Sequence, residues 1–376
     1  MSEAETTAQS LTLPLPLDQL PAALKRFCNP KGPAPARVMA AKGLVPVRGH
    51  DQVTMLAQLA HDETPDVRKA ALKTLEDLPE NVIDPACEAP LPAAVLNFLA
   101  GFLKREEAHT RIAVNAASAD ATVERIAATA SESLTERIAT NEARLLRAPT
   151  IIEALYKNRN TRMSTADRLV DLAARNGIEL TGIPAFAAHV EALQGELIPE
   201  PSDEPLPQDE TFVTTLAADS EEDVFERDKV TGQEDIKKQF KPLSMAIKDM
   251  TKAEKIRLAM VGSKAARSIL VRDNNKQIAY AAIASPQMTV QEAAEVAKSK
   301  EVSEDILRYV AGKREWIKQG EVKHNLVFNP KCPVGVSLKF ISHLRVDELR
   351  QLSRSRNVSG QLRSIGAQIL SRKEKR

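Results

Sequence analysis

Cysteine is scarce in this chain. Only Cys28, Cys87 and Cys332 occur among 376 residues, an odd number, and no CxxC spacing is present. This usage is typical of a reducing cytoplasm, and it argues against a disulfide framework or a zinc knuckle.

Long apolar runs are also missing. The longest, residues 91–103, contains Pro92 and Asn97 and is shorter than the ~18 residues that suggest a membrane span, so it predicts a buried helix. The first 20 residues carry acids instead of a basic segment followed by an apolar one, and we expect no signal peptide. Together these absences predict a soluble, cytoplasmic protein without a membrane span.

Catalytic motifs are absent as well. The sequence contains no G-x-x-x-x-G-K-[ST], G-x-G-x-x-G, H-E-x-x-H or G-x-S-x-G pattern, so the usual nucleotide, zinc-protease and hydrolase functions have no motif behind them. His324, Cys332 and His343 suggest a metal site, but their spacing matches no common ligand pattern, and surface or core positions are the favoured alternative. We expect no enzyme activity, no cofactor and no metal ion.

Aromatic side chains make up only 3% of the chain, whereas 43% of its residues are apolar and 27% are charged. Ala, Leu, Val, Ile, Glu, Lys and Arg supply most of it, and this mixture favours helices over strands. Thr251 with Glu254, and Thr289 with Glu292, have the spacing of a capping box at a helix start. The sequence therefore predicts an all-α protein.

Charge is unevenly distributed, although the formal net charge is only +1. Residues 196–235 hold 14 acidic and two basic side chains, a net charge of −12, whereas residues 236–376 hold 29 basic and 13 acidic ones, a net charge of +16. The acidic stretch also contains four prolines, which block a regular helix, and it is predicted to be an extended, disordered linker. We expect this linker to compete with an acidic partner for the basic part of the chain.

Short internal repeats occur on both sides of the acidic stretch. The triplet Arg-Ile-Ala begins at Arg111, Arg125 and Arg137, in steps of 14 and 12 that fit one helix plus a turn. In the basic part, Val261-Gly-Ser-Lys264 is followed by a related segment 22 residues later at Ile283 and by another 44 residues after that at Val327. Periods of about 20 to 50 residues are typical of stacked helical repeats, in which each unit covers the apolar face of its neighbour.

The segment from Met55 to Leu75 carries the most information. Leu56, Leu59 and Ala60 give a first helix an apolar stripe, and Thr64 and Pro65 suit the start of a second helix, whose inner face is predicted to contain Val67, Ala70, Ala71 and Leu75. This segment resembles a HEAT repeat, the helical hairpin of importins and phosphatase scaffolds. The resemblance implies that Asp62 and Arg68 take part in a ladder between neighbouring turns.

The other units are shorter and lack the paired Asp and Val-Arg, so they are closer to the leucine-rich-repeat variant. The basic part also resembles an uncharacterised bacterial protein family, a resemblance that carries no activity with it. We therefore predict two α-solenoid-like helical repeat modules joined by the acidic linker. The expected organisation is a flexible N-terminal arm at 1–20, a HEAT-like module at 21–195, the linker at 196–240 and a basic helical module at 241–376.

Candidate partner-binding residues lie in the basic module. Lys313 and Arg314 precede Trp316, and an exposed Trp beside basic residues is typical of an interface anchor, although a core Trp that locks two repeats together is the favoured alternative. Arg350 and Arg354 lie at i and i+4 on one helical face, followed by Arg356. Such a face suits phosphate contacts, and a solvated helix face is the alternative.

The leading interpretation is a non-catalytic scaffold or adaptor that binds a partner protein through its ridged helical surface. The alternative is a nucleic-acid-binding protein that uses the basic module, without base stacking because aromatic residues are scarce. A third interpretation, an enzyme like the HEAT-like DNA glycosylases, needs aromatic residues in a cleft, and the chain has only one Trp and three Tyr.

Overall fold

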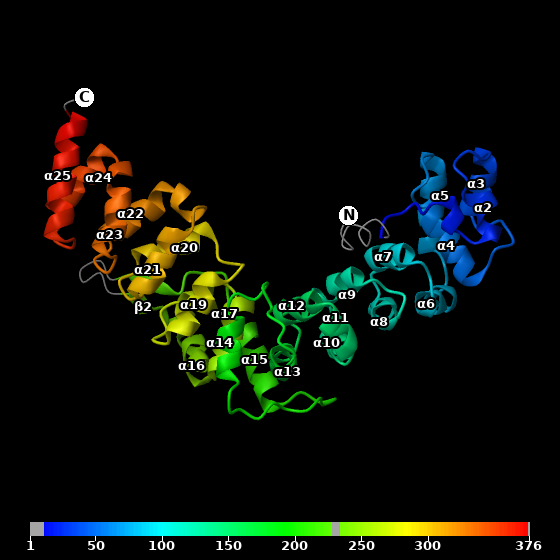
Figure 1. Cartoon of the computed structure of the whole chain (residues 1–376), viewed down its shortest axis with the longest axis horizontal. Coiled ribbons are helices and arrows are strands. Elements are labelled where there is room, and N and C mark those ends of the chain that lie inside the picture. The colour runs from blue at the N-terminus through cyan, green and yellow to red at the C-terminus, as the bar shows by residue number, and fades with distance from the viewer. Residues whose placement is uncertain (1–10, 228–233, 375–376) are drawn as a thin grey trace. The chain divides into compact units, whose positions relative to one another are not determined.

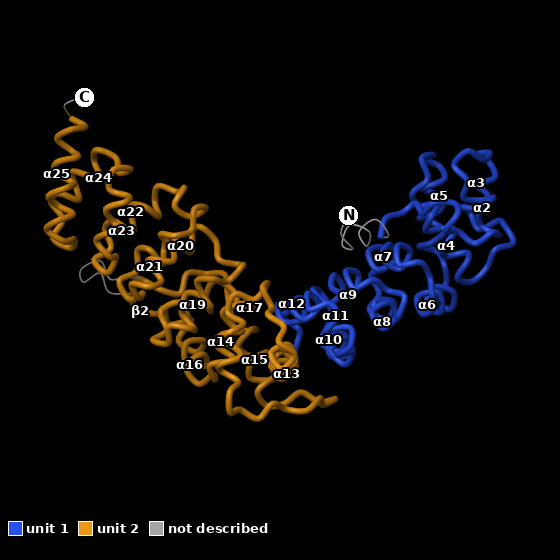
Figure 2. The backbone as a smooth tube through the Cα atoms, in the orientation of Figure 1, with its two compact units in different colours: residues 1–161 blue, residues 162–376 orange. Residues whose placement is uncertain are grey.

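The computed structural model describes residues 11–227 and 234–374, and almost all regular structure in them is helical (Figure 1). The all-α prediction is confirmed. The chain divides into two compact units, residues 1–161 and residues 162–376 (Figure 2). Within the described ranges, no helix combines the length and the apolar character that a membrane span requires.

The first unit consists of short helices. They are η1 (Leu17–Gln19), α2 (Ala22–Cys28), α3 (Ala34–Ala41), α4 (Gly49–Leu59), α5 (Pro65–Glu76), α6 (Glu80–Glu88), α7 (Ala93–Phe102), α8 (Glu106–Val114), α9 (Asp120–Ala127), α10 (Glu132–Ala139), α11 (Glu142–Arg147) and α12 (Pro149–Lys157). Many of them pack against the next helix and against the helix two positions further along, as α4 does with α5 and α6. Because a helix of two or three turns cannot bury its own apolar stripe, the core forms between successive helices.

The hairpin of α4 and α5 has the buried faces that the sequence predicts, except that Ala70 is only half-buried. Leu56 and Leu59 of α4 are buried, as are Val67, Ala71 and Leu75 of α5. These residues recur at three- and four-residue intervals, so each helix turns one apolar face to its neighbour.

Asp62 contacts the neighbouring hairpin, as in the implied ladder, whereas Arg68 does not. Asp62 pairs with Arg37 of α3, one hairpin earlier, with 2.8 Å between Oδ2 and Nε. Arg68 instead donates to the backbone carbonyls of Asp62 and Glu63. The partner of Asp62 is therefore the arginine at the corresponding helix position of the preceding hairpin.

Truncation of the inner face of α5 tests this packing. Leu75→Ala is expected to destabilise the first unit by about 2–5 kcal/mol, because it leaves a cavity at a fully buried site. Lys73→Ala, two residues away on the exposed face, is the control and should be nearly neutral. Urea unfolding monitored by circular dichroism measures both changes, and equal stabilities of the two variants would contradict the assignment.

The expected N-terminal arm is only partly separate from the fold. Residues 1–10 lie outside the described residues, but Leu15 and Leu20 are buried. The backbone of Leu15 exchanges two hydrogen bonds of 2.8 Å with the side-chain amide of Gln58 in α4. Residues 11–20 are thus attached to the first unit, because their apolar side chains and backbone groups find partners there.

Buried asparagines connect helices that are not consecutive, in both units. Asn115, Asn158 and Asn329 each follow the last residue of a helix, and each donates two hydrogen bonds of 2.7–2.9 Å to backbone carbonyls at the end of an earlier helix. The amide oxygen of each accepts from the backbone N–H two residues on. One side chain therefore shapes its own turn and satisfies carbonyls that the earlier helix leaves unpaired.

We expect Asn329→Ala to destabilise the second unit, because it leaves the carbonyls of Ala297 and Ser299 buried without these donors. Loss of a buried hydrogen-bond partner typically costs about 1–3 kcal/mol. The exposed Asn274 serves as the matched control, and Asn274→Ala should have little effect. If the two variants have the same midpoint of thermal unfolding, this connection does not contribute to stability.

The second unit continues the pattern of short helices. It contains α13 (Met163–Arg175), α14 (Phe186–Ala192), α15 (Pro207–Ala217), β1 (Phe225–Arg227), β2 (Glu234–Ile236), η2 (Lys238–Phe240), α16 (Lys241–Asp249), α17 (Lys252–Val261), α18 (Lys264–Leu270), α19 (Lys276–Ala284), α20 (Val290–Lys298), α21 (Glu304–Gly312), η3 (Trp316–Lys318), α22 (Gly320–Phe328), α23 (Val334–Phe340), η4 (Ile341–His343), α24 (Val346–Arg354) and α25 (Gly360–Glu374). The predicted capping boxes at Thr251 and Thr289 begin α17 and α20.

The acidic stretch at 196–240 differs from the expected disordered linker. The boundary between the two compact units lies after residue 161, and the described part of this stretch belongs to the second unit. It carries helix α15, in which Phe212 and Leu216 are buried. Asp209 at the start of α15 accepts hydrogen bonds from the backbone N–H and the hydroxyl of Ser164, at 2.8 and 2.9 Å. Apolar contacts and donors for its acids explain why this stretch folds.

The part of the stretch that follows α15 forms an acidic hairpin, residues 219–227 and 234–240. Its strands β1 and β2 pair antiparallel, with Phe225 opposite Ile236. Asp219 accepts from the hydroxyl of Ser263 and, at 3.0 Å, from the backbone N–H of Ala266, so it caps the start of α18. On the other strand, Glu234 pairs with Arg272 at 2.9 Å.

Glu234 and Arg272 form a buried ion pair whose side chains are 7% and 11% exposed. Glu234→Ala is expected to destabilise the second unit by about 3–5 kcal/mol, because it leaves the guanidinium buried without its carboxylate. The double variant Glu234→Ala/Arg272→Met should recover part of this loss, and Glu226→Ala on the exposed side of the hairpin should be nearly neutral. A double variant as unstable as Glu234→Ala in urea unfolding would show that the ion pair is not the cause.

Candidate partner-binding surfaces

The six residues predicted to bind a partner fall on two parts of the second unit. Lys313 and Arg314 directly follow α21, and Trp316 begins η3. Arg350 and Arg354 lie on α24, and Arg356 follows that helix. All five basic side chains are exposed, whereas Trp316 is buried with 8% of its surface accessible.

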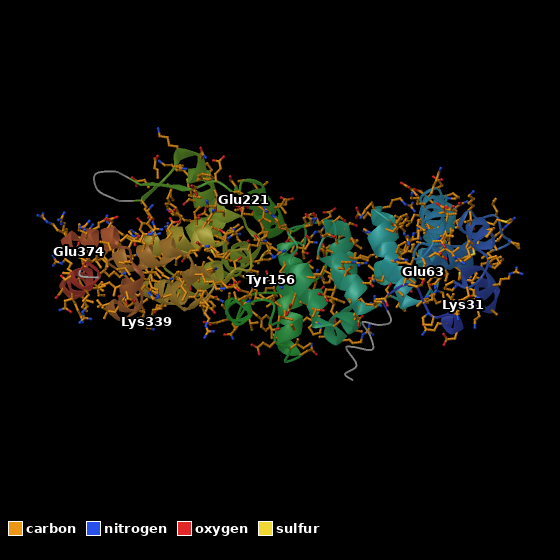
Figure 3. All side chains as sticks on the ribbon, turned by 90° about the horizontal axis from the view of Figure 1, so that it is seen from above. Lys31, Glu63, Tyr156, Glu221, Lys339 and Glu374 are labelled. Carbon is orange, nitrogen blue, oxygen red and sulfur yellow. The ribbon has the colours of Figure 1, made fainter. Side chains whose placement is uncertain are left out.

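Trp316 belongs to an aromatic cluster with Tyr280 and Tyr309. The rings of Tyr280 and Tyr309 meet edge to face with their centroids 5.4 Å apart, and those of Tyr309 and Trp316 are 6.0 Å apart. Trp316 thus packs between helices, as in the core alternative, and the exposed member of the cluster is Tyr280, at 42%. Sequence reasoning missed Tyr280 because it lies in an otherwise apolar helix, 36 positions before Trp316. Tyr156, labelled in Figure 3, is the remaining tyrosine and is buried in the first unit.

Lys313 lies beside this cluster. Its ammonium is 4.9 Å from the centre of the Tyr309 ring, a cation–π arrangement. A hydrogen bond with Tyr309 raises the pKa of Lys313, so the side chain stays positively charged at neutral pH. The cluster therefore presents one exposed ring and one fixed cation at its edge.

The arginines of α24 border a shallow groove of about 740 Å³. Its lining consists of Phe328, Asp347, Arg350, Gln351, Arg354, Ser355, Arg356 and Asn357, and we call it the arginine groove. The structure therefore brings together Arg350, Arg354 and Arg356, as the sequence suggests. Lys313, Arg314 and Trp316 are not among its lining residues.

The three arginines of the groove have different surroundings. Arg350 is held by two acids, Asp347 at 3.1 Å and Glu374 at 2.8 Å, and the contact with Glu374 raises its pKa. Glu374 is labelled in Figure 3. Arg354 and Arg356 form no ion pair within the described part of the chain. Two guanidinium groups consequently remain available for a ligand.

Phe328 supplies the apolar part of the groove. Its ring stacks on His324 with the centroids 4.4 Å apart, and His324 in turn contacts Glu348 at 3.2 Å. Guanidinium groups are planar and bind carboxylates or phosphates through two parallel hydrogen bonds. An arrangement of free arginines beside a half-buried ring suits a chain of acidic groups better than a single small ion.

The acidic hairpin does not cover these surfaces. Its acids pair with Lys264 through Asp223, at 2.5 Å, and with Arg272 through Glu234. The expected competition at Lys313, Arg314 and the arginines of α24 therefore has no counterpart in the described contacts of the hairpin.

His324, Cys332 and His343, which the sequence suggested as metal ligands, do not belong to a ligand cluster among the described residues. Across the ranges that the structure describes, no three His, Cys, Asp or Glu side chains lie close enough to hold a metal ion. All three cysteines are buried, and burial raises the pKa of the Cys28 thiol to about 12 and that of Cys87 to about 11. These thiols stay protonated at neutral pH and are poor nucleophiles.

Comparison with known proteins does not place the chain in a family. No family model, no curated protein and no solved structure matches it.

Proposed function

We propose that this chain is a non-catalytic scaffold of stacked, HEAT-like helical repeats whose second unit binds an acidic segment of a partner protein in the arginine groove. The observation that carries the proposal is the pair of exposed arginines, Arg354 and Arg356, which line one groove and form no ion pair with a described residue.

Packing between successive helices supports the repeat architecture. In the second unit, α17 packs on α19, α18 on α20 and α20 on α22, the same next-but-one pattern that the first unit has. Stacks of this kind present long surfaces and are used chiefly to bind other macromolecules.

The difference, among the described residues, between paired, buried arginines and unpaired, exposed ones supports an acidic partner. Arg267 and Arg272 are buried and paired with Glu292 and Glu234, so they serve the fold. Arg354 and Arg356 have no such role, and their charges favour association with an acidic segment by long-range attraction and by paired hydrogen bonds. Exposed charges of this kind are screened by salt, so binding should weaken as the salt concentration rises.

Nucleic acid is the second candidate ligand. It is favoured by Phe328, a half-buried ring at the edge of the same groove, because aromatic rings beside arginines also bind single-stranded bases. The two candidates differ in their probes and can be separated in one assay.

The test is fluorescence anisotropy with a labelled glutamate-rich peptide and a labelled single-stranded DNA, each at low and at physiological salt. Arg354→Gln/Arg356→Gln is expected to weaken peptide binding by about tenfold or more, because hydrogen bonds to charged groups contribute about 1.5–3 kcal/mol each. Arg363→Gln/Arg372→Gln removes the same charge from exposed positions outside the groove and should change affinity less than twofold.

The outcomes separate the interpretations. Equal losses in the two double variants would mean attraction to net charge alone and would contradict a groove site. Tighter binding of DNA than of the peptide, with a loss confined to the groove variant, would assign the groove to nucleic acid.

A further inference from the structure

A second cavity, of about 410 Å³, lies within the second unit and away from the arginine groove. It is bordered by α13, the end of α14 and the turn that follows it, the start of α15 and the first turn of α17. We call it the acidic cavity. Its volume is in the range of small-molecule sites, which lies at about 300–1,000 Å³.

A buried carboxylate lines this cavity. Asp167 is only 8% exposed, and its Oδ1 accepts a hydrogen bond of 2.8 Å from Nε2 of the fully buried His189. Among the residues that the structure describes, Oδ2 of Asp167 has no hydrogen-bond partner. A carboxylate in a residue that is largely buried, with one oxygen left without a protein donor, is a strong acceptor for a positively charged donor.

The remaining lining alternates between apolar and acidic groups. Leu193, Ile198 and Pro199 contribute apolar surface, and Glu191 and Glu196 are exposed carboxylates. Glu191 is oriented by Gln277, whose amide Nε2 donates to its Oε2 at 2.5 Å. The lining thus combines a buried carboxylate, an apolar wall and exposed carboxylates.

Lys252 is the only basic residue in the lining, so three carboxylates face one ammonium group. It is exposed at the start of α17 and forms no ion pair with a described residue. Its charge opposes the entry of a cation, and its removal should favour one.

We propose that the acidic cavity binds an alkylammonium group, with the cationic head on Asp167 and the alkyl chain along Leu193, Ile198 and Pro199. A second ammonium group at the other end of the chain would meet Glu191 and Glu196. This chemistry is found in free diamines and polyamines and in the side chain of a lysine from a partner protein. The proposal does not depend on the function assigned to the arginine groove.

Isothermal titration calorimetry of the full chain with putrescine, spermidine and Nα-acetyl-lysine methylamide tests the site. Saturable binding with one site per chain is expected, and Asp167→Asn should weaken it by at least tenfold, because the amide oxygen still accepts from His189 while the charge is lost. Lys252→Met should strengthen binding several-fold. A damaged fold cannot produce this opposite change.

Glu200→Gln and Lys248→Met are the matched controls, since they alter the same charges at exposed positions outside the cavity lining. Binding of the two amines identifies a free diamine or polyamine as the ligand, and binding of the lysine derivative alone identifies a protein lysine. The proposal is overturned if no probe saturates, or if the cavity variants and the controls bind with equal affinity. Should Asp167→Asn fail to fold, an unchanged affinity of Lys252→Met would decide against the site.

Discussion

The backbone groups at the ends of short helices govern how this chain folds. Each helix leaves its last carbonyls unpaired, and in a stack of helices many of these groups lie inside the protein. Asn115, Asn158 and Asn329 satisfy such carbonyls with their side-chain amides. Buried arginines act in the same way, as when Arg144 donates to the carbonyls of Ala113 and Asn115 at 2.9 and 3.0 Å. The apolar faces bring helices together. The polar side chains connect the turn after one helix to the end of an earlier helix.

The same requirement explains why the acidic stretch is ordered. A high density of like charge disfavours folding when the charges have no partners. Here Asp209 and Asp219 accept from backbone N–H groups near the starts of α13 and α18, where negative charge is favourable. Glu234 neutralises Arg272, over which the ring of Phe225 also lies at 3.9 Å. The carboxylates are therefore structural groups, and net charge alone is a poor guide to their role.

The basic residues of the second unit also fall into a structural group and an exposed group. Those that pair with acids inside the second unit, such as Arg267 with Glu292 at 2.8 Å, hold loops and helices in place. Those that line the arginine groove are exposed, and two of them, Arg354 and Arg356, form no ion pair with a described residue. Their positive charge is exposed to solvent and is available to an acidic ligand. This separation is the physical basis for the proposal that α24 and its C-terminal turn bind an acidic ligand.

The sequence by itself determined the features that depend on neighbouring residues. Helical periodicity and composition predict the all-α class, the inner face with Val67 and Leu75, and the capping boxes at Thr251 and Thr289. The basic face of Arg350 and Arg354 also follows from a four-residue spacing. The repeated Asn-Pro-Lys at Asn29 and Asn329 was a further local signal, and it could have pointed to the asparagine turns.

Only the tertiary structure decided the features that depend on distant pairs. Tyr309 of α21 contacts both Tyr280 and Trp316, and only this packing shows that Trp316 is buried and Tyr280 exposed. The acidic stretch folds because Glu234 meets Arg272, 38 positions away, and Asp209 meets Ser164, 45 positions away. Spacing along a chain specifies which residues share one helix face, but partners on different helices are selected by packing, which no local pattern contains.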